Sequence, residues 1–450
     1  MSLDGSQLSA PWAAPFAGLL LSIAFWPLAA PRFWHRHFGK IAAGWALAFL
    51  LPFALAFGPG AAAAALAHAL LADYVPFILL LTALFTISGG IHIRGRLRGS
   101  PALNCVILLA GAALASFMGT TGASMLLIRP LIGANQHRRH NAHVVIFFIF
   151  IVGNIGGALT PLGDPPLFLG FLRGVDFFWT TGHLFWHTLL LVAALLALFY
   201  VIDSHLLRKQ GQGDGARQAA PAPKGAPAFG IDGGVNFLLL AAALALVLMS
   251  GLWQSGVVLN ILGVELALHN LARDLGLIAV TVLSLAVTPR AVRQRNQFSW
   301  APMREVAKLF AGIFLTIIPV IAMLQAGAGG PFGAVARAVT RADGAPDPAM
   351  VFWATGLLSA FLDNAPTYLV FFNAAGGDPA QLMGPLAGAL TAISAGAVFM
   401  GAMTYIGNAP NLMVKAIAED RGVRMPGFFG YMAWSAAALL PLLAALTWWM

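Results

Sequence analysis

The chain has 450 residues, of which 59% are hydrophobic and only 9% are charged. Soluble proteins carry about 25% charged residues, so these charges are too few to cover a water-facing surface, and lipid is the expected solvent. The net charge of +9 comes from basic residues in short segments between apolar runs, which favours a topology signal over a nucleic-acid surface, and the single Cys105 excludes an internal disulfide framework.

Ten apolar stretches have the length that a membrane-spanning helix requires, about 20 residues. In chain order they are residues 11–30, 39–57, 75–91, 143–170, 182–202, 235–253, 275–288, 309–325, 388–416 and 426–449. The Ala-rich stretch 60–73 is shorter, and we expect an interfacial helix there. No basic segment precedes the first apolar run, so we expect a retained helix and not a cleaved signal peptide.

Two further apolar segments, residues 104–132 and 350–375, are interrupted near their middle by small and polar residues. The interruptions read SFMGTTGAS (116–124) and SAFLDNAPT (359–367). Hydrocarbon cannot satisfy the backbone groups that such a break exposes. We therefore expect two re-entrant hairpins and not kinked spans, and paired interruptions of this kind are typical of transporter binding sites.

The basic residues give this arrangement a direction. With the N-terminus outside, most of them fall in the inside segments 31–40, 94–101, 129–140, 203–234, 289–308 and 415–424, and the outside segments hold only Arg173, Arg273, Arg337 and Arg341. This bias requires the first hairpin to open to the inside and the second to the outside. The sequence thus predicts an all-α polytopic membrane protein with two inverted repeats, residues 1–207 and 235–450, joined by a flexible cytoplasmic linker, residues 208–234, with both termini outside.

A second kind of interruption follows each hairpin, in GNIGGALTPLGDPP (153–166) and GAMTYIGNAPN (401–411). Their prolines break the backbone hydrogen-bond ladder of a helix. We expect the freed carbonyls and the ends of the half-helices to become ligands for an ion or a substrate.

Asp164 and Asp363 are the acidic residues within these breaks, and a carboxylate at membrane depth is a functional hypothesis by default. The alternative is that each caps a half-helix, which is compatible with ion binding. The neutral candidates for ion or substrate binding are Asn154, Asn364, Asn408, Asn411, Thr120, Thr121, Ser124, Thr160, Thr367 and Thr404, although any single hydroxyl can equally be packing between helices. We interpret Asn154 and Asn408 as equivalent positions of the two halves. With the two acids they are the candidate Na⁺ ligands, since hard oxygen ligands suit this ion.

Three strings carry a resemblance to a known family: GNIGGALTPLGDPPLF (153–168), SAFLDNAPTYLVF (359–371) and YIGNAPNLMVKA (405–416). They resemble the ion-transporter superfamily, in its branch of arsenite permeases, citrate-type transporters and NhaD-type sodium/proton antiporters. The resemblance implies a homodimer in which a transport domain carries both hairpins and moves like an elevator against a scaffold domain. Carboxylate carriers of the superfamily have Ser-Asn-Thr at both hairpin tips, whereas this chain has GTTGAS and LDNAPT, and the latter is similar to the antiporter and arsenite-permease branch.

Our leading functional hypothesis is sodium/proton antiport, because two acids and neutral oxygens surround a pocket without Lys or Arg. An ion-coupled transporter of an organic or inorganic anion is the alternative, since half-helix N-termini can bind anions. An intramembrane aspartyl protease is a remote third class. Leu-Gly-Asp at 162–164 is similar to the end of the Gly-x-Gly-Asp motif of these proteases, but Pro161 stands where the motif has its first Gly. We thus expect no enzyme activity and no resident cofactor. The expected partners are a small ion or molecule and the bilayer of a bacterial inner membrane, with no nucleic acid.

Overall fold

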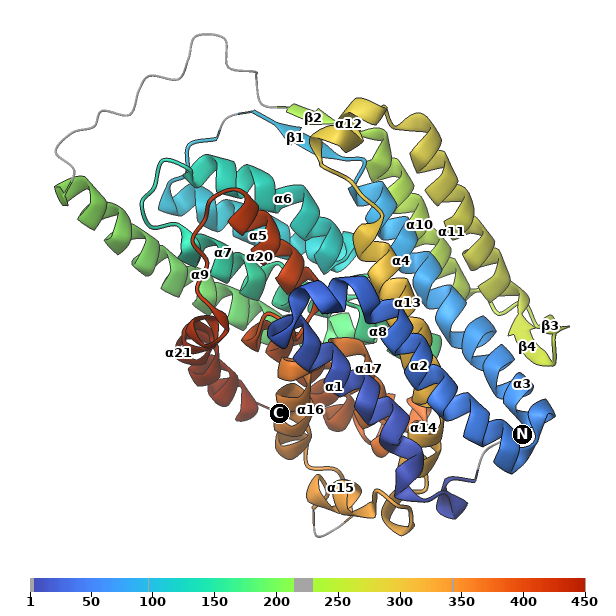
Figure 1. The fold of residues 1–450 in the computed structure, drawn as a ribbon. Coiled ribbons are helices and arrows are strands. Elements are labelled where there is room, and N and C mark those ends of the chain that lie inside the picture. Colours follow the sequence, from blue (N-terminus) through green and yellow to red (C-terminus); the bar gives the residue numbers. More distant parts are fainter. Residues whose placement is uncertain (1–3, 96, 214–229, 342–343, 450) are drawn as a thin grey trace.

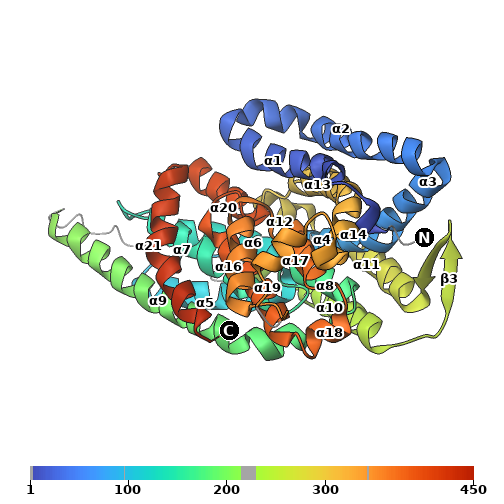
Figure 2. The same ribbon diagram turned by 90° about the horizontal axis from the view of Figure 1, so that it is seen from below.

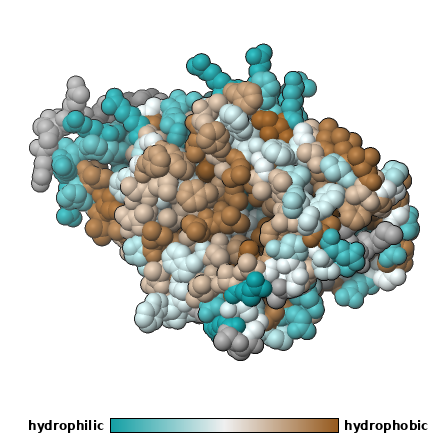
Figure 3. All heavy atoms as spheres, turned by 60° about the horizontal axis from the view of Figure 1, so that its bottom comes forward, coloured by the Kyte–Doolittle hydropathy of each residue, from teal (hydrophilic) through white to brown (hydrophobic). Residues whose placement is uncertain are grey.

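The computed structural model describes residues 4–95, 97–213, 230–341 and 344–449. In these ranges nine helical stretches are long and apolar enough to cross a membrane, or ten if one bent pair counts as a single span. The protein is an all-α polytopic membrane protein (Figure 1). Figure 3 shows one face of it, where apolar side chains gather across the middle and hydrophilic ones lie toward the edges. This part of the prediction is confirmed.

The first spans differ from the prediction at their ends. α1 (Ala14–Ala29) is followed at once by α2 (Pro31–Phe57), so the expected loop 31–39 is helical. α3 (Pro59–His68) continues through a π-helical segment (Ala69–Tyr74) into α4 (Val75–Ser88). The separate interfacial helix expected over residues 60–73 is therefore wrong, since it forms one long apolar stretch with α4.

The corresponding helices of the second half are α10 (Val235–Leu252), α11 (Leu268–Val287), α12 (Arg290–Arg295), α13 (Ala301–Thr316) and α14 (Ile318–Gln325). α13 and α14 form the predicted span 309–325, bent by 44°. Pro319 in the first turn of α14 lacks an N–H and explains the bend.

The first interrupted segment is a hairpin, hereafter hairpin 1, of α5 (Pro101–Met118) and α6 (Thr120–Asn135). The chain reverses at Gly119, which has φ +78° and ψ 150°, a conformation that side chains strain. At the base, the Gly99 N–H donates to the Ala134 carbonyl at 2.8 Å. The amides of Asn104 and Asn135 also bond each other there at 3.0 and 2.9 Å. The chain thus leaves on the side where it entered, as predicted for residues 104–132.

The second interrupted segment is hairpin 2, in which α16 (Pro348–Phe361) packs against α17 (Asn364–Ala374). The break lies at Leu362 and Asp363, inside the predicted range 350–375. Figure 1 shows that the elements that precede the two hairpins, β1 (His92–Arg94) and α15 (Gly333–Ala338), lie at opposite ends of the molecule. The two hairpins therefore enter from opposite sides.

Two predicted spans are each two half-helices. Residues 143–170 form α7 (Ala142–Ile151), a 3₁₀ turn η4 (Ile155–Leu159) and α8 (Pro165–Leu172). Residues 388–416 form α19 (Ala387–Phe399), a 3₁₀ turn η6 (Met400–Met403) and α20 (Ala409–Asp420). The breaks fall where the Gly- and Pro-rich motifs predicted them.

The contacts between helices define two groups. In Figure 2, α1, α2 and α3 of one group lie on the opposite side of the molecule from α9 and α21 of the other. The flanking group contains α1–α4 and α10–α14, and the hairpin group contains both hairpins, α7, α8, α19, α20, α9 (Trp179–Gly213), α18 (Pro379–Met383) and α21 (Phe428–Thr447). Two small antiparallel pairs, β1 with β2 (Gly230–Asp232) and β3 (Val258–Ile261) with β4 (Val264–Ala267), connect elements of the flanking group. Of the predicted flexible linker, residues 208–213 are the helical end of α9, and most of the rest lies outside the described residues.

Gly119→Ala should destabilise the protein by about 1–3 kcal/mol, because a Cβ strains the backbone at this positive φ. Thermal unfolding of the purified protein in detergent measures the effect. Gly133→Ala is the control, because Gly133 lies within α6, which Gly119 caps, and a Cβ added there would meet open space, so the change should be neutral or slightly stabilising. Equal midpoints for the two variants would contradict the strained reversal at Gly119.

Candidate functional site

Two threonines hold the hairpins in matching ways. The Thr160 hydroxyl donates to the Ser116 backbone carbonyl, and the Thr404 hydroxyl donates to the Ala360 carbonyl. Each hydroxyl also accepts an N–H at 3.2 Å from the residue two positions later, Leu162 or Ile406. Both pairs are 44 residues apart, and 404 − 160 and 360 − 116 are both 244. The two halves are thus related residue by residue around the breaks.

This register aligns GALTPLGDPP (157–166) with GAMTYIGNAP (401–410). Asp164 then corresponds to Asn408, and both begin a helix in extended conformation, with ψ 141° in each. The interpretation that Asn154 and Asn408 are equivalent is therefore wrong, since Asn154 precedes its 3₁₀ turn whereas Asn408 follows one. A Gly-Asn pair in each motif, 153–154 and 407–408, produced the false match.

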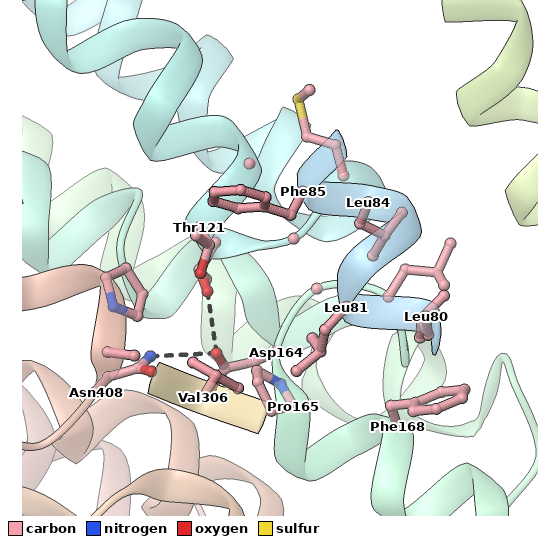
Figure 4. A pocket seen from close by; sticks show the side chains of 18 of the residues that line it. Leu80, Leu81, Leu84, Phe85, Thr121, Asp164, Pro165, Phe168, Val306 and Asn408 are labelled. Atoms are coloured by element: carbon pink, nitrogen blue, oxygen red, sulfur yellow. Dashed lines mark hydrogen bonds between the residues drawn. The ribbon is translucent and has the colours of Figure 1, made fainter. Parts of the chain in front are cut away.

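Asp164 is the centre of the site and is 1% exposed. Its carboxylate accepts hydrogen bonds from the Thr120 hydroxyl at 3.1 Å, the Asn364 amide at 2.7 Å and the Asn408 amide at 3.2 Å. These donors come from hairpin 1, hairpin 2 and the start of α20, as the close-up in Figure 4 shows in part. One carboxylate therefore joins both hairpins and both helix breaks.

Asparagines extend this network away from the carboxylate. Asn154 accepts from the Asn408 amide at 3.2 Å and donates to Asn411 at 2.8 Å. Asn411 in turn donates to the backbone carbonyls of Gly401 and Thr404, at 2.8 and 2.9 Å. These amides thus satisfy backbone groups that the break in the helix leaves free.

Asp363 has a different environment, because it caps α17 and is only half-buried. Its carboxylate accepts the Ala365 N–H at 3.1 Å. Together with Asp164 it lines a cavity between the hairpin group and the flanking group, so the predicted meeting of the two acids is observed.

The cavity has a volume of about 80 Å³. One water needs roughly 10–15 Å³ in this measure, so there is room for several waters or a partly hydrated ion. Of the predicted residues, the cavity wall includes Thr120, Thr121, Asp164, Asp363 and Asn408, and it contains no Lys, Arg or His among the residues that the structure describes. Its other wall is apolar and comes from α4 and α13, with Leu80, Leu84, Phe85, Met303, Val306 and Phe310.

The site also gathers helix N-termini. α6, α8, α17 and α20 all begin there, at the capping residues Gly119, Asp164, Asp363 and Asn408. The N-terminus of a helix carries a partial positive charge. The site thus combines two acidic side chains with the positive ends of several helices.

Other candidates lie away from the cavity. The Ser124 hydroxyl is buried without a hydrogen-bond partner among the described residues, and the Thr367 hydroxyl donates to the Asp363 backbone carbonyl at 3.0 Å. Sequence reasoning missed Ser359, whose hydroxyl lies 2.7 Å from the Asn364 side-chain oxygen, although the break motif contains it. It also missed the α4 and α13 wall, for which an ordinary apolar span gives no signal.

Residues 5–450 match the model of a family described as "Putative citrate transport". The chain belongs to this family. Two relatives, each named an uncharacterized transporter, come from Mycobacterium bovis and Mycobacterium tuberculosis. Each is 27% identical over 340 residues, which cover 73% of this chain and 72% of the relative. The protein is thus a membrane transporter of the citrate-transport family. This finding confirms the resemblance that its motifs carry.

Thr160→Val should lower the stability of this transporter by about 1–3 kcal/mol, because it leaves the Ser116 carbonyl and the Leu162 N–H without their buried partner. Thr188→Val is a matched control, since the Thr188 hydroxyl is buried with no partner among the described residues and its loss should be neutral. We call the paired hydrogen bonds of Thr160, and those of Thr404, a threonine clasp. Thermal unfolding midpoints in detergent compare the two variants. A Thr160→Val midpoint as high as that of the control would argue against a stabilising role of the clasp.

Proposed function

We propose that this protein is a secondary transporter that exchanges Na⁺, or a similar cation, for protons at Asp164 and Asp363. The observation that supports this proposal is the shared cavity, which both carboxyl groups line and which no described basic side chain enters. A pocket of this charge attracts cations and protons in competition with each other.

The hydrogen bonds of Asp164 suit such an exchange. A carboxylate has about four acceptor positions, and three are used by Thr120, Asn364 and Asn408. The remaining position can take a proton or contact a cation, and binding of one excludes the other. The Thr120 hydroxyl and the Asn408 side-chain oxygen are neutral groups that would complete the coordination of a cation.

The location of the cavity between the two helix groups supports alternating access. Two hairpins of opposite direction meet at one site, so a shift of the hairpin group against the flanking group would expose the site to either side in turn. We include in the proposal an elevator-like movement, a homodimer, a bacterial inner membrane, and repeats at residues 1–207 and 235–450 with both termini outside.

A second candidate function is ion-coupled transport of an organic anion. The four helix N-termini at the site favour it, as does the family description. In this case the acids would hold the coupling cation, and the helix ends would hold carboxylate groups of the anion.

Transport into proteoliposomes separates the two candidates. An antiporter should release protons from the lumen, reported by an internal pH dye, when Na⁺ is added outside without any organic anion. An anion carrier should instead accumulate labelled citrate in the presence of the cation. Citrate uptake with no proton movement in its absence would replace the first proposal by the second.

Asp164→Asn and Asp363→Asn should each reduce Na⁺-driven proton movement to the level of empty liposomes, because an amide neither binds a proton nor neutralises a cation. Asp420→Asn should transport like the wild type, since Asp420 is exposed at the end of α20 and away from the cavity. Wild-type exchange by either of the first two variants would remove that acid from the mechanism.

A further inference from the structure

α8 lies between two cavities. Its capping residue Asp164 and its residues Pro165 and Phe168 line the site cavity, whereas Phe171 and Leu172 line a second cavity of about 910 Å³. The second cavity is also bounded by the end of α10 and by the start of α11. α8 has only eight residues and is about 12 Å long, so a single short helix separates Asp164 from the second cavity.

The partition between the cavities is thin at Phe168. The ring of Phe168 lines the site cavity, and the Arg273 guanidinium, which lines the second cavity, lies 5.9 Å from the centroid of this ring. Arg273 is 1% exposed and is fixed by Asp274 at 2.8 Å and by Asn270 at 3.2 Å. A single aromatic side chain of α8 therefore separates the site cavity from a fixed part of the flanking group.

An ion pair ties the far end of α8 to the flanking group. Arg173 directly follows α8, and its guanidinium lies 3.1 Å from the carboxylate of Asp73. Asp73 belongs to the π-helical segment that continues into α4, and α4 forms the apolar wall of the site cavity. The two side chains are 27% and 15% exposed, so water screens the pair only in part.

We propose that the Asp73–Arg173 ion pair is a latch that holds α8 against α4 in the state seen here, in which Asp164 lines the site cavity and is separated from the second cavity. Breaking the pair frees α8 to shift, so that Asp164 becomes accessible from the second cavity. The latch rests on alternating access in the proposed function, but not on the identity of the transported ion. A hydrogen bond at 2.9 Å from Gln325 of α14 to Asn373 of hairpin 2 also connects the two groups, so loss of the latch shifts the balance of states without abolishing either.

A reporter cysteine tests the latch without any transport measurement. The native Cys105 is replaced by Ser, and Val306→Cys places a thiol on the α13 wall of the site cavity. Asp73→Asn and Arg173→Gln should each slow labelling of this thiol by about two- to fivefold, the range that a partly exposed ion pair supports. The exchanged pair Asp73→Arg with Arg173→Asp should restore the original rate. Asp176→Asn is the control, since it removes an acid from the same loop outside the ion pair and should leave the rate unchanged.

Cross-linking gives a second measurement, which restores the connection after both charges have been removed. Asp73→Cys with Arg173→Cys, in the chain with Cys105 replaced by Ser and without the reporter thiol, are joined by a reducible bifunctional thiol reagent. The cross-link should stop transport, and reduction should allow its recovery. Unchanged labelling in both single variants, no recovery in the exchanged pair, or full transport by the cross-linked protein would overturn the latch. If the variants change labelling as expected but the wild type exchanges no cation for protons, the proposed function is refuted and the latch is still supported.

Discussion

The structure depends on the need to satisfy backbone polar groups where helices are broken inside a membrane. Hydrocarbon offers no partner for a free N–H or carbonyl, so each break must be closed by protein. Thr160 and Thr404 accomplish this in the same way, since each hydroxyl reaches across to a hairpin carbonyl and accepts an N–H of its own turn. Asn364 and Asn408, which donate to Asp164, also lie at these breaks, so the closure of the breaks and the candidate site share residues.

The two halves correspond residue by residue around the breaks, but their acidic residues stand at different positions. Asp164 stands where the second half has Asn408, and Asp363 stands where the first half has Gly119. Each half therefore contributes one carboxyl group, one after the helix break and the other at the hairpin tip. The first is almost fully buried and accepts three hydrogen bonds, whereas the second is half-buried. This asymmetry gives the two carboxyl groups different environments within one cavity.

Composition and motif position predicted the polytopic fold, both hairpins and the meeting of Asp164 with Asp363, because lipid leaves few alternatives for interrupted apolar segments. The predictions were wrong where the local sequence fits two structures equally well. Residues 60–73 have no helix stop before α4, and the Gly-Asn pairs at 153 and 407 look alike although they lie on opposite sides of a turn. The apolar wall formed by Leu84 and Val306 had no distinguishing signal, since its role arises only from packing between distant helices.

The constant spacing of 44 residues between the two ends of each threonine clasp restricts how this chain can change in length. One inserted residue in an α-helix turns everything beyond it by about 100°, since a turn contains 3.6 residues. An insertion in α7 or α19 would therefore rotate the following half-helix away from its hairpin tip, whereas the β3–β4 turn and the stretch after α9 lie outside both clasps. We therefore expect chains of this family to vary in length at the periphery and not between a hairpin and its break.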